Sequence, residues 1–457
     1  MTNEGLLCLM WRGAGISLLI LAACLFYSGV SKAADTSDSV TFARDIAPIF
    51  QAKCEECHHQ GTAAPMSLST YKEARPWAKS IRERVITRNM PPWHIDKTVG
   101  IQRFQYDRSL TDEQISAIVR WVDSGAPLGD IKDLPPPKQW PDKDWELAKH
   151  FGPPDLVVKS EDYTMPAQGQ DVWFRPVTDV PLTEPRWVRA VEVRPGTTAG
   201  RKIMHHVLAG LIQEESGQGR VNPAEPNAGQ AALLMEWAIG KNYDIYRPNT
   251  GKLLLPGARI SWELHLSAVG EQIRDHAELA VYLYPKGETP KYRTRITLFH
   301  AYATTVDDLD IPPNSIAVTQ GFHALHQPAR LESFQPHMHL RGKAMALKAI
   351  LPDGSIQILS YVNNFNFNWM NNYIYADDAA PVLPKGTILN VIAWHDNTAR
   401  NKSNPDPDQW VGWGNRTIDE MAHAWVNVTY ISEEDYKRWV AESRATRTVS
   451  TAPRPPQ

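Results

Sequence analysis

Cysteine is scarce in this chain. Its 457 residues include 4 cysteines, and two of them, Cys8 and Cys24, lie in the N-terminal segment. Only Cys54 and Cys57 remain in the body, so no framework of disulfides supports the fold. An excess of charge of one sign is also missing, because 48 Lys and Arg residues oppose 51 Asp and Glu residues. A chain without a surplus of positive charge lacks the electrostatic footprint of a nucleic-acid-binding protein.

Long apolar runs are absent after residue 35, which excludes a polytopic membrane protein. The apolar run at residues 13–30 follows Arg12 and precedes Ser31-Lys32-Ala33, a pattern typical of a secretory signal peptide that ends at residue 33. An uncleaved membrane anchor and a lipoprotein signal that acylates Cys24 are the alternatives. In each case the protein is exported, and we expect a bacterial periplasmic or otherwise extracytoplasmic location.

The two cysteines of the body lie in the motif Cys54-Glu55-Glu56-Cys57-His58. This C-x-x-C-H spacing is typical of covalent haem attachment, in which both thiols bond to the vinyl groups and the histidine binds the iron. A redox disulfide needs a thioredoxin-like context, and half of a zinc site needs a second Cys/His pair. Neither is visible, so the motif predicts one covalently bound haem c.

The second axial ligand of this haem has several candidates. Met90 stands in Asn89-Met90-Pro91-Pro92-Trp93, and a methionine followed by proline resembles the axial loop of class I cytochromes c. Met66, His59 and His94 compete with it, and a packed core residue is the alternative for both methionines. We favour Met90.

Two amphipathic helices are expected around the haem motif. One covers residues 42–50, and the other opens at Leu110 with Thr111 as its N-cap and ends at Gly125. Together with the motif they predict a small all-α cytochrome c domain over residues 34–133. A proline-rich linker follows at residues 134–154.

Beyond the linker the chain changes to short β-branched and aromatic runs, broken by Pro, Gly and Asn. This pattern predicts an all-β region. Its length suggests two β-sandwich domains, at residues 155–288 and 289–432, with a seam near residues 286–292. Residues 433–457 are expected to form a C-terminal helix and a disordered tail.

Histidines in the β region have the spacing of metal ligands. In His337-Met338-His339 the two imidazoles share one face of a strand, a good chelating geometry for zinc or copper. The adjacent pair His205-His206 points to opposite faces, so one metal takes both only where the strand bends or ends. His265 lies on an alternating strand, where a lone histidine is more often a structural residue.

These features, with a terminal Asp419-Glu420-Met421, follow one another in a single order. In this combination the region from about residue 155 to 432 resembles the copper type II, ascorbate-dependent monooxygenases, the family of peptidylglycine α-hydroxylating monooxygenase and dopamine β-monooxygenase. The resemblance implies two jelly-roll sandwiches with one copper each, two coppers in all. It assigns the electron-storing copper to His205, His206 and His265. It assigns the O2-binding copper to His337, His339 and Met421, where the soft thioether favours Cu(I).

The sequence departs from the peptide-hydroxylating members at three positions that hold the substrate carboxylate. These positions are Gln335, His423 and Trp425 here. A buried anion without a cation is costly, so a neutral or aromatic small molecule fits them better. The histidines of the region that match no motif include His423, and we expect most of them to be structural or solvent-facing: His276, His300, His323, His326, His395 and His423.

The sequence is compatible with two functions from different classes. The first is an exported copper monooxygenase that hydroxylates a C–H bond with O2, with electrons from ascorbate or a periplasmic redox protein delivered through the fused haem. The second is a non-catalytic haem and copper electron-transfer protein. Retention of all six candidate ligands favours the enzyme. A zinc hydrolase is disfavoured because the chain has no His-Glu-x-x-His pattern.

Overall fold

The computed structural model describes residues 39–60, 64, 66–139, 145–213, 232–238, 241 and 243–450. The expected signal peptide with Cys24, and the expected tail beyond residue 450, lie outside the described residues. In the part of the chain that is described, no helix is long and apolar enough to cross a membrane.

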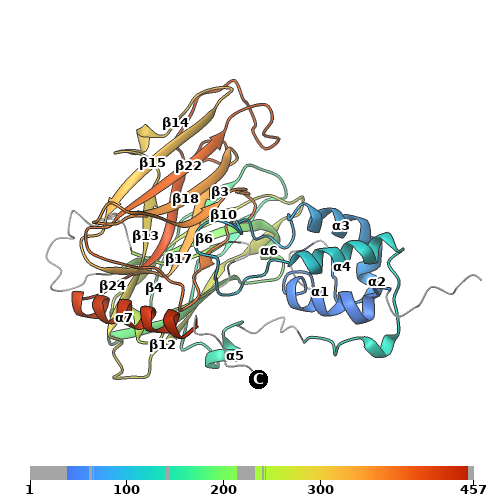
Figure 1. Ribbon diagram of the computed structural model, residues 1–457, viewed down its shortest axis with the longest axis horizontal. Coiled ribbons are helices and arrows are strands. Elements are labelled where there is room, and N and C mark those ends of the chain that lie inside the picture. The colour runs from blue at the N-terminus through green and yellow to red at the C-terminus, as the bar shows by residue number, and fades with distance from the viewer. Residues whose placement is uncertain are drawn as a thin grey trace, which may run out of the picture.

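The molecule is mostly β-sheet with few helices (Figure 1). This confirms the β-rich fold that the sequence predicts for the larger part of the chain. The helices that lie before the first strand are α1 (Ala47–Lys53), α2 (Tyr71–Ala74), α3 (Ala78–Ile86), α4 (Asp112–Asp123) and α5 (Ala148–Phe151). Two more helices are α6 (Gly200–Ile203), inside the β region, and α7 (Glu433–Ser450), at its end.

The helices α1 to α4 gather around a small core of their own. A π-helical turn, Phe42–Ile46, leads into α1, and Thr111 caps α4 through a capping box with Gln114, as the sequence predicts for Thr111. Phe42 and Trp121 are buried in the core between these helices. The proline-rich stretch returns to this part, where the Gln51 side chain donates to the Pro136 carbonyl at 3.0 Å.

The strands form a first β region, β1 to β12, and a second β region, β13 to β24. The first contains β1 (Leu156–Lys159), β2 (Tyr163–Met165), β3 (Val172–Phe174), β4 (Val177–Asp179), β5 (Arg186–Pro195), β6 (Met204–Ile212), β7 (Ala232–Ala238), β8 (Tyr243–Ile245), β9 (Thr250–Leu254), β10 (Arg259–Leu266), β11 (Ile273–Asp275) and β12 (Ala277–Leu283). The second contains β13 (Tyr292–His300), β14 (Asp310–Ile311), β15 (Ile316–Ala324), β16 (Ala329–Leu331), β17 (Ser333–Met338), β18 (Gly342–Ile350), β19 (Ile356–Val362), β20 (Tyr373–Ile374), β21 (Val382–Leu383), β22 (Ile388–Asp396), β23 (Val411–Gly412) and β24 (Ala422–Tyr430).

Each β region buries its own apolar core between two layers. In the first, β1, β12 and β5 pack against β6, β7 and β10. In the second, the sheet β15-β22-β18-β19 packs against β13, β24 and β17. Strand β13 joins the two regions, because it pairs with β24 on one side and with β7 and β9 of the first region on the other.

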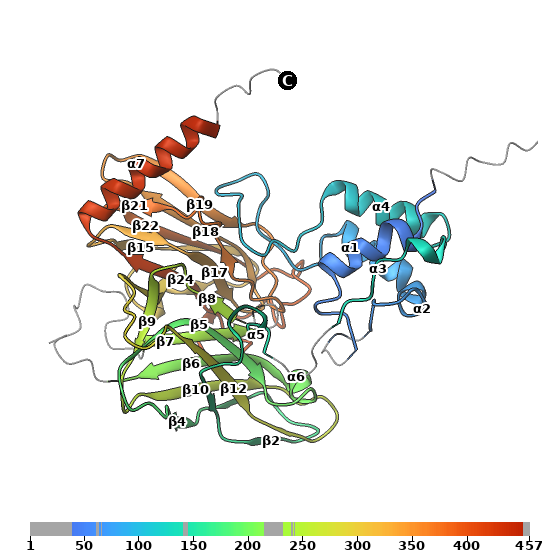
Figure 2. The same ribbon diagram turned by 90° about the horizontal axis from the view of Figure 1, so that it is seen from below.

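A segment between α3 and α4 belongs to the second β region. Trp93 and Ile95 are buried in the core of that region, and Ile95 and Phe104 form bridges with Val362 and Tyr375. Residues 92–105 therefore fasten the helical part to the β part, well before the proline-rich stretch is reached. Figure 2 shows this segment of the chain as it runs from the helices toward β19.

Candidate metal centres

Strand β6 carries the first histidine group at a break in its regular pairing. His206 lies opposite His265 of β10, but the next pair joins Leu266 to Met204, so His205 is the extra residue of a bulge. A bulge lets two successive side chains turn toward the same side of a sheet. The ring centres of His205 and His206 lie 5.4 Å and 4.8 Å from that of His265. The structure thus brings the three predicted residues together, by the bend that an adjacent pair requires.

The geometry of His206 and His265 matches a shared metal ion. Their Nδ1 atoms are 3.3 Å apart. Two nitrogens held at about 2.0 Å from one tetrahedral ion lie about 3.3 Å apart, and their ring centres about 5 Å apart. Burial lowers the pKa of His206 well below its usual value, which keeps this imidazole neutral, the form that binds metals.

Asp171 supports this group from behind. His265 is 3% exposed, and its Nε2 lies 3.0 Å from the Asp171 carboxylate, which also accepts a hydrogen bond from Ser267. Burial lowers the pKa of His265, and the hydrogen bond and charge of Asp171 act in the opposite direction. A carboxylate on one ring nitrogen fixes the tautomer and leaves the other nitrogen for a metal. Trp173 stacks on the same imidazole, with ring centres 4.6 Å apart.

The second histidine group lies where the end of β17 pairs with the start of β24. His337 and His339 have ring centres 5.4 Å apart, again near the value for a shared ion. Nδ1 of His339 lies 3.1 Å from the Asp419 carbonyl, which leaves Nε2 as its free nitrogen. Burial lowers the pKa of His339 to about 4.

Met421 lies beside this group, directly before the first residue of β24. His337 pairs with His423 and Met338 with Ala422, and Met421 and His339 are the residues that adjoin this last pair. Its side chain is half-buried, and its carbonyl lies 3.2 Å from Nε2 of His395. The backbone therefore brings Met421 close to the second group.

A further histidine, His423, enters the second group although no sequence motif marks it. Its ring stacks on that of His337 with centres 4.6 Å apart. Burial lowers its pKa to about 3. The signal that finds it is the strand register, which the sequence alone does not supply.

The two groups lie close enough to affect each other. Among the influences that lower the pKa of His206 is the charge of His339, and those that lower the pKa of His337 include His206 and His265. Strand alternation explains the arrangement. Val207 and Ala424 face the apolar cores of the two regions, so their neighbours His206 and His423 face away from them.

Neither group forms a complete metal-coordination site in this conformation. Within the residues that the structure describes, no three His, Cys, Asp or Glu side chains are arranged to hold an ion. In the first group the His205 side chain is exposed, while His206 and His265 form the closer pair. The second group as predicted has only two residues of these types, because its third member is a thioether. The donor types and the distances within each pair fit copper.

The haem motif forms the end of α1 and the turn after it. Cys54 is the C-cap of α1, and the amides of Cys57 and His58 donate to the Cys54 carbonyl at 3.1 Å and 2.9 Å. Both cysteines are free thiols, and burial raises the pKa of Cys54 to about 12 and that of Cys57 to about 11. Nδ1 of His58 lies 3.1 Å from the Met66 carbonyl, so Nε2 is its free nitrogen. A histidine held in this way fits an iron ligand.

The candidates for the second axial position lie in different places. The Met66 backbone is on the Nδ1 side of His58, opposite the nitrogen that would bind iron. Met90 is half-buried in the turn after α3, where its amide donates to the Arg84 carbonyl. His59 binds the Glu55 carbonyl through Nδ1 at 2.7 Å. His94 is 6% exposed, and its amide donates to the Tyr373 hydroxyl at 3.1 Å.

The haem motif faces the first β region. Charges that shift the pKa of the Cys57 thiol include those of Arg108, Glu146 and Arg201. Arg201 lies in α6, which leads directly into His205, and both views place α6 at the side of the β region nearest the helices (Figures 1 and 2). The Tyr106 and Tyr243 rings meet edge to face, 5.8 Å apart, at the same junction.

The loop after Met90, in contrast, is joined to the second β region. The Asn371 amide donates to the Pro92 carbonyl at 3.0 Å, and the Gln335 amide donates to the Met370 carbonyl at 3.2 Å. Gln335 is two residues before His337. The chain around the haem motif is thus tied to the neighbourhood of both histidine groups.

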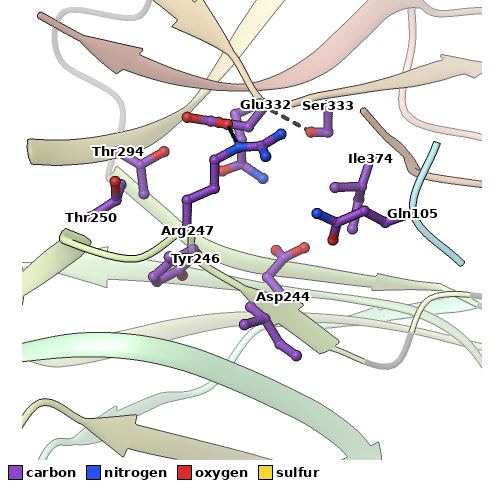
Figure 3. A pocket seen from close by; sticks show the side chains of 11 residues that line it. Gln105, Asp244, Tyr246, Arg247, Thr250, Thr294, Glu332, Ser333 and Ile374 are labelled. Atoms are coloured by element: carbon purple, nitrogen blue, oxygen red, sulfur yellow. Dashed lines mark hydrogen bonds and ion pairs between the residues drawn. The ribbon is translucent and has the colours of Figure 1, made fainter. Parts of the chain in front are cut away.

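Buried charges hold the two β regions together next to the second group. Arg247 of the first region pairs with Glu332 and Asp377 of the second and donates to the Tyr375 carbonyl at 2.9 Å. Figure 3 shows the Arg247 side chain directed at Glu332 across a cavity of about 30 Å³, which is lined by residues of both regions and by Gln105. None of the candidate metal ligands lines this cavity.

Gln335 belongs to the same buried network. It is 2% exposed and donates to Glu236, and the Lys241 ammonium is 3.5 Å from its amide oxygen. Lys241 is itself paired with Glu236 and Asp244. The cation beside Gln335 is therefore already neutralised by protein carboxylates.

Comparisons with known proteins give no family. No protein-family model matches the chain, and none of the curated proteins matches it significantly. Two similar solved structures are the VP2 subviral particle of infectious bursal disease virus and the Gt strain of that virus. The first is 13% identical, with a TM-score of 0.17, and the match covers 62% of this chain and 73% of that chain. The second is 12% identical, with a TM-score of 0.15, covering 64% and 75%. These scores are too low to indicate a shared fold.

Proposed function

We propose that this protein is an exported copper-dependent monooxygenase that hydroxylates a C–H bond of a small molecule with O2 and takes its electrons through a covalently attached c-type haem. One observation carries the proposal. Two histidine groups from separate β regions lie near each other, and in each group one pair of imidazoles has the separation expected for two ligands of one copper ion. This arrangement supports the resemblance to the ascorbate-dependent copper monooxygenases, which implies two jelly-roll sandwiches with one copper each.

The residues of the first group suit an electron-storing centre. Three imidazoles accommodate copper in both oxidation states. Asp171 holds His265 in one tautomer, and Trp173 covers its ring, so this ligand keeps its position when the charge of the centre changes. His205, His206 and His265 would hold this copper.

The residues of the second group suit a centre that meets O2. His337, His339 and Met421 would hold the other copper, with Nε2 of His339 as the donor because Nδ1 is bonded to a carbonyl. When bound, the two coppers supply one-electron steps and the activation of O2. The thioether of Met421 favours Cu(I). Burial keeps the histidines unprotonated, so protons do not compete with metal.

The helical part would serve as the electron entry. Cys54 and Cys57 would attach the haem, with His58 and Met90 as its axial ligands. Insertion of one oxygen atom into a C–H bond, with reduction of the other to water, consumes two electrons and two protons. A haem attached at Cys54 and Cys57 would supply a one-electron donor at high local concentration, because the helical part is joined to the β part through the hydrogen bond between Asn371 and Pro92.

The substrate is proposed to be neutral. The Gln335 amide and the Lys241 ammonium are already paired inside the protein, so neither is available to a substrate carboxylate. Trp425, on the same face of β24 as His423, offers an aromatic surface instead. A neutral or aromatic small molecule avoids the cost of an unpaired buried anion.

Metal content and oxygen uptake test the function together. The protein purified after export should contain two coppers and one haem iron per chain, and a library of neutral aromatic compounds should yield one that accelerates oxygen uptake by the ascorbate-reduced protein. His337→Ala should abolish that uptake and keep the first copper. His276→Ala, on the surface of the first β region, is the matched control. A content of one copper or none would favour the non-catalytic electron-transfer protein.

A further inference from the structure

The sheet β15-β22-β18-β19 is apolar on both of its faces. Its inner face, which includes Leu347, Leu389 and Val391, packs into the core of the second β region. Side chains alternate along a strand, and residues directly opposite each other on neighbouring strands point to the same side. The register therefore assigns the residues between these core positions to the other side of the sheet, which we call the outer face (Figures 1 and 2).

Two neighbouring rows of the outer face run across all four strands. The register aligns the members of each row: Phe322, Asn390, Lys348 and Ile358 in the first, and Ala324, Ile388, Ile350 and Ile356 in the second. Further along the sheet, Val318 pairs with Trp394, whose ring meets that of Tyr361 edge to face with centres 5.9 Å apart. The apolar side chains of the outer face thus form a nearly continuous surface.

The large apolar side chains of this surface are open to solvent. Six of them are between 37% and 64% exposed: Ile316, Val318, Phe322, Ile356, Ile358 and Ile388. They are six of the sixteen large apolar side chains that are exposed in the described part of the chain. Single exposed apolar residues are ordinary in soluble proteins, but a contiguous apolar patch marks an interaction site. We therefore expect a partner to cover the outer face.

The charge of the outer face favours a second copy of this chain as that partner. Lys348 is the one charged residue of the two rows, so two copies of this face bring apolar surfaces together with little repulsion. A bilayer surface would instead attract clusters of Lys and Arg residues. The composition of the face is therefore suited to contact with its own copy.

The size of the outer face is also sufficient for a dimer. Its four strands have 9, 9, 9 and 7 residues. With a rise of about 3.3 Å per residue and a strand spacing of about 4.8 Å, the face measures roughly 30 Å by 19 Å, or roughly 600 Å² in projection. Projecting side chains add to this area, so the face approaches the ~800 Å² that each partner contributes to a standard interface.

The edge of the sheet at β19 is closed to another chain. The amides of Asp96 and Ile101 donate to the carbonyls of Tyr361 and Leu359, at 2.8 Å and 2.9 Å. An edge covered in this way cannot add a strand from a second copy. Two sheets can instead meet face to face, about 10 Å apart, with their side chains interdigitated.

We infer that the protein forms a symmetric homodimer in which the outer faces of two chains pack against each other. The same face serves both copies, so the contact closes on itself and gives a dimer and not a filament. The second histidine group lies on β17 and β24, in the opposite layer of this β region. The dimer therefore does not depend on the proposed function, and loss of the dimer should leave the copper content unchanged.

The mass of the protein in solution tests the dimer. Interfaces of this size have micromolar or tighter dissociation constants, so sedimentation at about 10 µM should give twice the mass of one chain. Val318→Lys and Phe322→Lys each place a positive charge in the contact, and each should weaken the dimer at least about 100-fold. Val177→Lys is the matched control, because Val177 is 44% exposed on β4 of the first β region, against 56% for Val318. The control should dimerise as the wild type does.

Side-chain oxidation of the wild type locates the contact without any variant. Hydroxyl radicals should modify Phe322 more slowly well above the measured dissociation constant than well below it, while Trp77, which is exposed in the helical part, should react equally in both states. A monomer at about 100 µM, a dimer that survives both lysine variants, or equal oxidation of Phe322 in both states would overturn the inference. Binding of a monomeric wild type to phosphatidylcholine vesicles that Val318→Lys abolishes would also overturn it, because the outer face would then meet lipid.

Discussion

Removal of the Asp171 charge should weaken the first copper site without unfolding the protein. In Asp171→Asn the amide oxygen still accepts the hydrogen bond from His265, while the negative charge that makes the imidazole more basic is lost. Asp171 lies at the surface of the first β region and pairs with no cation among the described contacts. The fold should therefore tolerate the change.

The magnitude follows from the position of the carboxylate. Residues that hold a metal-bound histidine from behind contribute about 10–100-fold to metal affinity, which corresponds to about 1.4–2.7 kcal/mol. The Asp171 side chain is 37% exposed, so solvent screens part of its charge. We therefore expect the lower half of that range, a loss of roughly 10–30-fold in affinity for the first copper.

The assay is a titration of the metal-free protein with Cu(I) against a competing chelator. Asp162→Asn is the matched control, because this carboxylate also pairs with a histidine of the first β region, His276 at 3.0 Å, and is 43% exposed. The control should bind both coppers as the wild type does. Equal affinities in Asp171→Asn and the wild type, or an equal loss in the control, would refute the role of Asp171 as a support of His265.

Four further predictions concern other parts of the molecule. Met90→Ala should abolish the long-wavelength methionine-to-iron charge-transfer band of the ferric protein, and loss of that band in Met66→Ala instead would show that the wrong methionine was chosen. Met421→Ala should retain the first copper and lose hydroxylation, so undiminished turnover of an identified substrate would exclude the thioether as a ligand. Arg247→Met removes one of the two cations of the buried Glu332 carboxylate and leaves Arg330 at 2.9 Å from it, so it should lower the unfolding free energy by about 1.5–3 kcal/mol in urea denaturation; a loss below about 0.5 kcal/mol would show that the pair does not hold the β regions together. Burial lowers the pKa of Lys252 to about 7, so between about pH 7 and about 10.4 this amine is neutral in the folded protein and protonated in the unfolded chain. Stability should therefore rise with pH over this range. Lys252→Met should flatten the rise in thermal unfolding temperature, and an unchanged slope would contradict the prediction.

Several features of the molecule could be predicted because they depend on short-range patterns in the sequence. The C-x-x-C-H motif, the N-cap at Thr111 and the β-rich character after residue 155 each depend on residues close together in the chain. The bend at His205-His206 could also be anticipated, because one metal takes two adjacent strand residues only where the pleat is broken. The bulge opposite His265 supplies that break.

The second histidine group contains a contact that short-range sequence patterns do not predict. His337 and His339 share a strand, so their spacing reveals a common face. His423 meets His337 only through the register of two strands that are far apart in the sequence, and no local pattern sets that register. No motif in the sequence therefore indicates that His423 lies beside His337.

By itself, the sequence determined which residues can bind metals and which segments form helices or strands, because these depend on residue chemistry and short-range periodicity. Tertiary structure decided which of those residues meet. It brought Asp171 to His265, 94 positions away, and packed Trp93 and Ile95 into a β region that begins almost two hundred residues later. Such contacts form because apolar faces are buried together and buried polar groups must be satisfied, and both conditions apply to the folded chain as a whole.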